Sequence, residues 1–453
     1  MTEHTRRIGA GLLAALFFPG AAGATSLDVN TFYRMRALSY KNLYLDGGSN
    51  DRSFITQNAQ LSAFVRNIPV QLGPYPDQTL DVGLSLRGIG VAGSTTALQS
   101  PFDSIASHYP NTSFVPYVES AYVKVKQLFG RPIEATFGQQ AFTLGSGLLL
   151  ADDGVGMTGV SMMGGLPFWD MKAGGFIFQP RNSQAAADSL MVYGLTLELP
   201  TEGVWQLNQL VEKDQMSQSV TVNNLAVNKV TRQFTSLRYQ MSYGPFVFDG
   251  EAAIQRGSAG PGGPSPGNPN GERIRFDANA QVLKAKWRQR LWRTGGEGIA
   301  RLSFARGSGD VGATRTTDEA FFPSRGHRFD GLERGGFGDF FGATPYDAFG
   351  GKSSVTASGL PAGLSGIQTV GIGFTPPAYR GIALDLDYFL FQADRNSLGA
   401  TRTLGQEYDI RLRYNARDRF AIQAGIAFFK AGDAISPTKP SARRITFEVL
   451  GRF

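Results

Sequence analysis

The chain has 453 residues, a formal net charge of +7 and no cysteine, and its mean hydropathy is −0.15. The lack of cysteine excludes a disulfide framework and thiolate chemistry, and the modest charge gives no reason to expect a nucleic-acid partner. After the N-terminal segment, no stretch approaches the roughly 18 uninterrupted apolar residues of a membrane-spanning helix.

The N-terminus has the features of a secretory leader. Arg6 and Arg7 precede an apolar run at 8–18, and a small-x-small cleavage pattern follows at 22–24. We therefore predict a signal peptide over residues 1–24. The alternative is a transmembrane anchor, but the apolar run is too short to span a bilayer.

Apolar and polar residues then alternate in repeated segments. Ile382, Leu384 and Leu386 alternate with polar residues that include Asp385 and Asp387. A period of two indicates strands with one apolar and one polar face. Such segments predict about eighteen strands, at 27–38, 54–66, 79–90, 116–127, 132–141, 157–163, 171–178, 190–199, 203–212, 232–243, 245–256, 273–291, 297–306, 366–376, 380–392, 405–414, 418–430 and 442–453.

In the predicted strand 273–291, the parity of the apolar residues reverses near Val282 and Leu283. An extra residue in a strand moves every later side chain to the other face of the sheet. The reversal therefore predicts a β-bulge at this point.

The lengths of the predicted connections depend on whether the preceding strand has an even or an odd number in chain order. Connections that follow even-numbered strands are mostly short, as at 128–131, 200–202, 244, 377–379 and 415–417, with 67–78 as one moderately long exception. Those that follow odd-numbered strands are long, at 91–115, 142–156, 213–231, 257–272, 307–365 and 431–441. Bacterial outer-membrane barrels alternate short periplasmic turns with long outer loops in this way.

The fold expected for residues 25–453 is all-β: a membrane-spanning antiparallel up-and-down β-barrel in the bacterial outer membrane. The final strand ends on Phe453, which resembles the C-terminal signal of such barrels. The expected partners are outer-membrane lipid on the apolar face and the barrel-assembly machinery at this strand. A soluble all-β protein is the alternative, but it does not explain the loop sorting or the terminal aromatic residue.

On the barrel interpretation, the polar strand faces line a lumen. The densest basic cluster is Lys284, Lys286, Arg288 and Arg290, with Arg301 on the next strand. Rings of basic residues in a narrow lumen favour anions. The predicted solute path is lined by Arg34, Arg36, Arg87, Arg238, Arg275, Arg288, Arg290, Arg301, Arg411 and Arg413.

The alternative is that these basic residues form structural ladders. Asp385 and Asp387 lie on the strand next to Arg411 and Arg413. Cross-strand pairing between opposite charges would neutralise both sets.

Catalysis has little support in the sequence. After removal of the leader only His108 and His327 remain, both in long loops and neither in a nucleophile motif. No acidic spacing resembles a calcium loop. We therefore expect no enzymatic activity, no cofactor and no metal.

Two loops stand out. The segment 257–272 is rich in Gly and Pro and is expected to be a flexible outer loop. The loop 307–365 holds aromatic and charged residues, with His327, Arg328 and Asp339 as candidates for solute contact. Such a long loop forms either a constriction or an outer lid that contacts the solute, or a self-packed cap without a ligand role.

Two stretches resemble the alginate export family of outer-membrane barrels. One reads Phe322-Pro323-Ser324, then His327 and Gly331, then Gly338-Asp339-Phe340-Phe341. The other reads Phe137-Gly138-Gln139-Gln140, followed by Asp152 and Met157-Thr158-Gly159-Val160, with Gln139 where the family often has Arg. The resemblance implies an electropositive channel that passes an anionic polysaccharide, an alginate-like uronate polymer, to the cell surface.

The residues by themselves indicate only an outer-membrane pore that favours anions. A general diffusion porin for small anionic solutes is therefore the main alternative to polysaccharide export. A barrel whose loops bind partners, as in an adhesin, is a third. Block by uronate oligomers, weak selectivity without block, or no conductance would separate the three.

Overall fold

A computed structural model of the chain describes residues 25–45, 51–70, 75, 77–93, 109–167, 170–180, 190–214, 220–222, 225–227, 229–260, 270–290, 296–312, 314, 316–326, 336–348, 358–416 and 419–453. The predicted signal peptide, residues 1–24, lies outside these ranges. No helix within the described ranges is long and apolar enough to cross a membrane.

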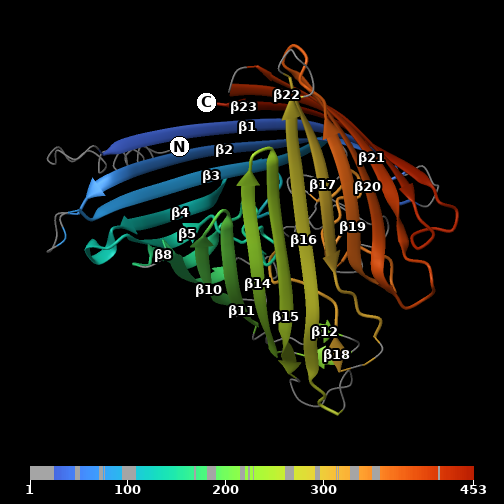
Figure 1. The fold of residues 1–453 in the computed structure, drawn as a ribbon, viewed down its shortest axis with the longest axis horizontal. Helices are drawn as coiled ribbons and strands as arrows, with labels where there is room; N and C mark the ends of the chain where they lie inside the picture. Colours follow the sequence, from blue (N-terminus) through green and yellow to red (C-terminus); the bar gives the residue numbers. More distant parts are fainter. Residues whose placement is uncertain are drawn as a thin grey trace, which may run out of the picture.

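The fold is a closed antiparallel barrel whose strands follow one another around the wall in chain order (Figure 1). Tyr33 of the first strand lies opposite Gly451 of the last, and this pairing closes the barrel. The wall strands are β1 (Ser26–Lys41), β2 (Arg52–Pro69), β3 (Thr79–Gly93), β4 (Tyr117–Lys126), β5 (Ile133–Gln140), β8 (Met157–Gly165), β9 (Lys172–Pro180), β10 (Leu190–Pro200), β11 (Val204–Asp214), β14 (Lys229–Tyr243), β15 (Phe246–Gly260), β16 (Ile274–Arg290), β17 (Glu297–Gly307), β19 (Leu364–Thr375), β20 (Ile382–Asn396), β21 (Thr403–Ala416), β22 (Phe420–Ala431) and β23 (Ser441–Arg452).

Short elements in the connections complete the described structure. The described sheet has 19 strands, because the short strand β18 (Thr317–Asp318), which belongs to a loop, pairs with Arg275 and Phe276 of β16. Two small hairpins, β6 (Thr143–Leu144) with β7 (Leu150–Ala151) and β12 (Val220–Val222) with β13 (Leu225–Val227), also belong to loops. The 3-10 helix η1 (Leu128–Gly130) forms part of the turn after β4.

The predicted fold class is confirmed. Each of the predicted strand ranges overlaps one wall strand, and the connections alternate in length as expected. Only residues 201–203 join β10 to β11, whereas residues 141–156 join β5 to β8 and residues 308–363 join β17 to β19. The loop predicted at 257–272 begins later, because β15 continues to Gly260; residues 261–269 lie outside the described ranges.

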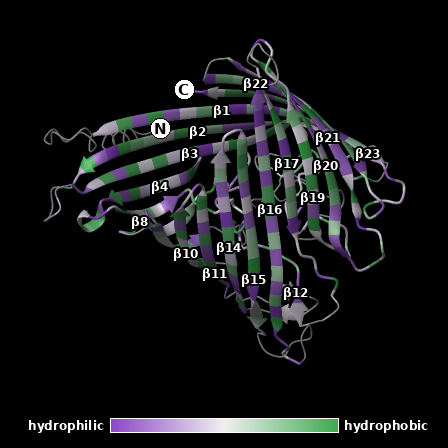
Figure 2. Cartoon of the chain, in the orientation of Figure 1, coloured by the Kyte–Doolittle hydropathy of each residue, from purple (hydrophilic) through white to green (hydrophobic). Residues whose placement is uncertain are grey.

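Hydrophobic and hydrophilic residues alternate along the wall strands (Figure 2), and many of the large apolar residues in these strands are exposed. Leu195 is 65% exposed and Leu302 55% exposed, although both lie within regular strands. In water such a continuous apolar surface would be costly. The wall is therefore built to contact lipid, as expected for a location in the bacterial outer membrane.

Strand β16 has no bulge at Val282, so that prediction is wrong. Its register with β15 runs without a break from Trp287 to Ile274. Even-numbered residues point inward along the whole strand: Ile274 and Phe276 are buried on the same side as Val282. The apolar residues change from even to odd positions at Val282 because the surroundings of the strand change there. Between Val282 and the short-turn end of β16, lipid lies outside the wall. Between Val282 and the loop end, packed loops fill the barrel interior and water lies outside.

Buried apolar clusters occupy the loop end of the barrel interior. One cluster joins Leu148, Phe321 and Tyr346 from two loops to the inner faces of β8–β17. Another joins Phe340 and Phe341 to the inner faces of β19–β23. The loops therefore pack inside the wall, and they define which part of the interior stays open.

Candidate channel lumen

The loop 141–156 enters the barrel and is tethered to the inner faces of β14 and β15. The backbone N–H and the hydroxyl of Ser146 donate to Glu251 Oε2 at 2.7 and 2.5 Å. Arg238 Nη1 donates to the carbonyl oxygen of Gly145 at 2.6 Å. Glu251 is only 2% exposed, so its charge is satisfied by the loop and not by water.

Gly145 is required at this tether. Its φ is +62°, a conformation that favours glycine. A Cβ at this position would lie 2.5 Å from Glu251 Oε1. The glycine therefore allows the close approach of the loop backbone to the buried carboxylate.

The first part of the loop 308–363 packs on the same side of the interior. Phe322 donates its backbone N–H to Gln255 Oε1 at 3.0 Å, and its carbonyl oxygen accepts from Arg232 Nη1 at 2.7 Å. The backbone N–H of Ala151 donates to the carbonyl oxygen of Arg325 at 2.6 Å, which joins the two inward loops. The two loops therefore form one inserted unit.

The second part of that loop is attached to β21. Glu407 accepts the backbone N–H groups of Phe340 and Phe341 at 2.6 and 3.0 Å. The ring of Phe341 stacks on Phe429 with centroids 4.9 Å apart. This segment therefore lines the barrel interior, and its conformation is set by a buried carboxylate on the wall.

Asp339 is the charged residue of this attachment. Its backbone N–H donates to Asp409 Oδ2 at 3.0 Å, and its carboxylate accepts from Arg411 Nε at 2.6 Å. Burial by itself raises the pKa of Asp339, but Arg411 and Arg444 beside it outweigh burial and leave the pKa below its usual value. Asp339 is therefore an anion held by wall arginines.

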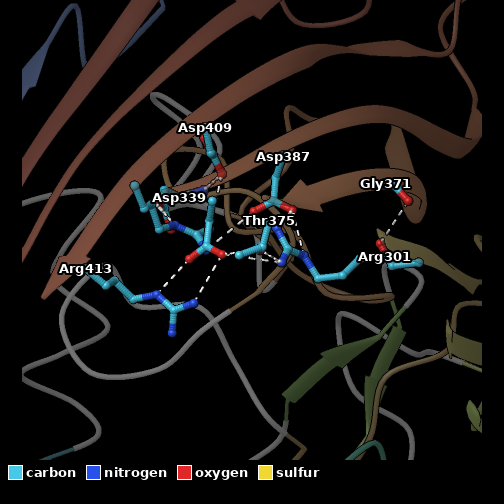
Figure 3. A network of polar contacts seen from close by, with 10 residues as sticks. Arg301, Asp339, Gly371, Thr375, Asp387, Asp409 and Arg413 are labelled. Atoms are coloured by element: carbon cyan, nitrogen blue, oxygen red, sulfur yellow. Dashed lines mark hydrogen bonds and ion pairs between the residues drawn. The ribbon is translucent and has the colours of Figure 1, made fainter. Parts of the chain in front are cut away.

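A network of charges covers the inner faces of β17, β19, β20 and β21 (Figure 3). Arg301 Nη2 lies 2.9 Å from Asp387 Oδ1, and Arg413 Nε lies 2.7 Å from Asp385 Oδ2. Arg411 Nη1 lies 3.6 Å from Asp387 Oδ2. These are the cross-strand pairs that the sequence offers as the alternative to a free basic ring. Within the described residues, no group of three or more His, Cys, Asp or Glu could hold a metal ion.

A cavity of about 510 Å³ lies between this network and the inserted loops. Its wall side carries Lys284, Lys286, Arg301 and Arg411, and Asp387 is the only acidic residue among the described residues that line it. Lys286 lies directly opposite Arg301 in the sheet register. Within the described residues, no carboxylate oxygen lies within 4.0 Å of Lys284 or Lys286 in an ion pair, so both carry net positive charge into the cavity.

A second cavity, of about 580 Å³, lies on the inner faces of β1–β5 and β8. Its lining is mostly neutral and polar: Asn30, Gln60, Ser62, Ser85, Ser120, Thr136, Gln140 and Ser161. Lys124 and Glu119 are its charged lining residues. The described lumen thus has a hydroxyl-rich part and a cationic part.

The residues predicted to line the solute path fall into several groups. Arg36 pairs with Glu448 at 2.6 Å, and Arg87 pairs with Glu119 at 2.7 Å. Arg34 lies near enough to both arginines to interact with their charges. Arg238 pairs with Asp249 at 2.7 Å in addition to holding the loop 141–156, so it acts in the architecture of the lumen.

The other members of the predicted set lie apart from these. Arg288 and Arg290 lie at the short-turn end of β16, where the backbone N–H of Arg288 donates to Pro245 at 2.9 Å. Arg275 points outward, with a side chain that is 70% exposed and close to Asp277. The predicted inward direction of Arg275 depended on the bulge that β16 lacks, and that prediction is wrong. His327 and Arg328 lie outside the described residues.

Sequence reasoning missed the two carboxylates that hold the loops. The alternation of polar and apolar residues predicts correctly that Glu251 and Glu407 point toward the interior. Nothing in the sequence alone links them to Ser146 or Phe340. One signal was present: Glu407 lies between Phe389 and Phe429 in the register of its neighbouring strands. An inward acid flanked by aromatic rings indicates a covered site and not a water-filled one.

No protein-family model matches the chain, and no curated protein sequence matches it. Solved structures are similar in fold. OccK9 (OpdG) of Pseudomonas aeruginosa is 12% identical with a TM-score of 0.55, covering 94% of this chain and 99% of that one. OccAB4 of Acinetobacter baumannii is 11% identical with a TM-score of 0.54, covering 96% and 100%. OpdK of Pseudomonas aeruginosa with vanillate is 11% identical with a TM-score of 0.50, covering 94% and 98%.

At these identities the similarity establishes the fold alone. The alginate export family expected from the two motif stretches is not shown, since no family model matches. The chain has the fold of an outer-membrane, porin-like β-barrel.

Proposed function

We propose that the protein is an outer-membrane channel that passes small anionic solutes. The observation that carries the proposal is the composition of the 510 Å³ cavity, which four cationic side chains and one carboxylate line. Asp387 is already engaged by Arg301 at 2.9 Å. A solute carboxylate is therefore the group that would complete the charge of this surface.

The electrostatics of the cationic wall support an anion as the solute. Lys286 and Arg301 face one another across neighbouring strands, and like charges in that position repel. A solute anion between them would offset the repulsion. The surrounding wall and loops have a low dielectric constant, which strengthens the attraction for a passing anion.

The size of the open space favours small solutes over a polymer. A volume of about 510 Å³ falls in the range of small-molecule sites, ~300–1,000 Å³. The inserted loops 141–156 and 308–363 take up much of the remaining interior at the loop end. OpdK, which is similar in fold, has been solved with vanillate, an aromatic carboxylate of this size class. Passage of an alginate-like polymer is the alternative proposal, and it requires the inserted loops to move aside.

In this proposal, the predicted arginines have different tasks. Arg301, Arg411 and Arg413 form the charged wall together with Lys284 and Lys286. Arg34, Arg36 and Arg87 line the interior of β1 and β3 beyond the cavity, where Arg36 and Arg87 stabilise the wall through their pairs with Glu448 and Glu119. Arg288 and Arg290 meet the solute at the short-turn mouth.

The experiment is uptake by liposomes that contain the purified barrel. Pairs of solutes with the same size, one a monocarboxylate and one a neutral amide, are compared. The proposal predicts faster entry of the carboxylate and no block by uronate oligomers. Equal entry of both solutes would contradict anion preference, and strong block by uronate oligomers would favour the polymer alternative.

A further inference from the structure

The outer wall at the loop end of the closing seam carries a set of unpaired cations. Lys41 ends β1, Arg443 lies near the start of β23 and Lys430 lies near the end of β22. Each is exposed and alternates with buried residues, so each side chain points away from the barrel interior. We call Lys41, Arg443 and Lys430 the seam patch.

The sheet register brings the members of the seam patch close together. Lys41 lies directly opposite Arg443, and Lys430 lies opposite Ser441, two residues from Arg443. Directly opposed residues have Cβ atoms about 5 Å apart and diagonal neighbours about 7–8 Å apart. Like charges at these spacings repel, and no outward position of β1, β22 or β23 is acidic.

Two outward cations elsewhere on the wall, Arg256 and Arg275, lie beside a carboxylate, whereas Lys213 contacts the ring of Tyr193. Arg256 forms an ion pair with Asp277, and Arg275 Nη2 lies 3.7 Å from the same residue. Near the seam patch, Asp51 accepts from the backbone N–H of Asn42 at 3.0 Å, and Asp433 pairs with Lys439 at 2.9 Å. Among the ion pairs of the described residues, none includes a member of the seam patch.

The seam patch lies where the lipid-facing belt ends. Phe428 and Ile445, 44% and 41% exposed, are the last large apolar residues before Lys430 and Arg443 on the outer face. From Ile445 in β23 to Phe453 just after it, the apolar row spans nine residues, which is eight residue-to-residue steps. At about 3.4 Å per residue and a tilt of about 40°, this height approaches the apolar thickness of the outer membrane, ~25 Å. The cations therefore lie level with the headgroups of the outer leaflet.

A small pocket adjoins the seam patch on the same outer face. Its volume is about 220 Å³, and it is lined by Leu390, Thr403, Gln406, Lys430, Asp433 and Lys439, among others. It offers the ammonium group of Lys430, that of Lys439 paired with the Asp433 carboxylate, a hydroxyl and an amide beside an apolar residue. This combination fits a phosphate that is joined to a sugar and an acyl chain.

We propose that the seam patch and its pocket bind the phosphate groups of a phosphorylated glycolipid in the outer leaflet. The three cations lie at headgroup height on a lipid-facing wall and form no ion pair with a described carboxylate, and a phosphate would offset their mutual repulsion. This site lies on the opposite face of the wall from the lumen, so it goes beyond transport of solutes.

The test measures binding of bisphosphorylated lipid A to the purified full-length barrel in zwitterionic bicelles. The variant combines Lys41→Gln, Lys430→Gln and Arg443→Gln. Each cation at an anionic surface contributes about fivefold, so the triple variant should bind about 100-fold more weakly. The matched control is Arg275→Gln, an outward cation with its own carboxylate, which should change binding less than twofold. Unchanged conductance verifies that each variant is folded.

Several results would overturn the assignment. Equal binding by the wild type and the triple variant would remove the seam patch from lipid recognition. Equal binding of dephosphorylated lipid A would remove the phosphate from the argument. Displacement of the lipid by millimolar inorganic phosphate would identify the site as one for free anions. A loss in Arg275→Gln as large as that in the triple variant would show general charge attraction only.

Discussion

The tether between Ser146 and Glu251 should control how open the channel is. Replacing Glu251 by Leu removes the acceptor of two hydrogen bonds, at 2.7 and 2.5 Å, and leaves the partly buried backbone N–H of Ser146 without this acceptor. Hydrogen bonds to a charged group contribute about 1.5–3 kcal/mol each. With partial compensation by the apolar side chain, the loop loses about 3 kcal/mol of docking free energy, or roughly 150-fold in its docking equilibrium.

Two further variants make this prediction quantitative. Glu251→Gln keeps one oxygen for Ser146, and Glu251 Oε1 has no hydrogen-bond partner among the described residues. It should therefore behave nearly as wild type. Ser146→Ala removes only the hydroxyl bond and should shift the docking equilibrium about tenfold, from roughly 1.5 kcal/mol.

The assay is single-channel recording in planar bilayers. Because Ser146 and Leu148 line the 510 Å³ cavity, release of the loop should raise the conductance and add gating noise. The expected order is wild type and Glu251→Gln, then Ser146→Ala, then Glu251→Leu. Heat-modifiable migration in gels checks that each barrel is folded. Equal traces for Glu251→Leu and Glu251→Gln would refute the tether.

Three other predictions follow from the same structure. The double variant Lys284→Glu, Lys286→Glu should lose or reverse anion preference, seen as a shift in reversal potential; an unchanged potential would place both outside the solute path. Burial, together with the charges of Asp310 and Glu319, raises the pKa of Asp318 from 3.8 to about 6. The pairing of β18 with β16 is therefore most stable below pH 3.8, where Asp318 is protonated in both states. It weakens as the pH rises through 6, by at most about 3 kcal/mol. Hydrogen exchange at the Arg275 amide, corrected for intrinsic rate, should show this loss, and Asp318→Asn should abolish it; a pH-independent wild type would contradict the assignment. Deletion of Phe453 removes two backbone hydrogen bonds with Thr31, each 2.9 Å long, and should lower the fraction of assembled barrel in membrane fractions. Normal assembly would show that Phe453 is not needed for assembly of the barrel.

The wall of the barrel could be predicted because each of its strands obeys a local rule. An inward residue meets water and an outward one meets lipid, so polarity alternates with a period of two. The rule failed at Val282, where the outward surroundings change from lipid to water and the inward ones from water to packed loops. A bulge and a change of environment produce the same reversal in the order of apolar and polar residues, so the sequence alone does not distinguish them.

The interior could be predicted only in part. The inward direction of Arg411, Arg413 and Asp385 follows from strand parity, and their pairing follows from strand adjacency. The attachment of Asp339 to Arg411 does not, because a loop position has no register with the wall. The sequence likewise does not show that the charges of Lys284 and Lys286 are left without a carboxylate. That can be seen only when the partner of each nearby acidic residue is known from the structure.

The most direct measurement of the central claim is the reversal potential of single wild-type channels under a tenfold salt gradient. The cationic wall predicts a potential whose sign corresponds to anion flow, and a decline in selectivity as salt screens the wall. A potential near zero, a preference for cations or the absence of any conductance would contradict the account.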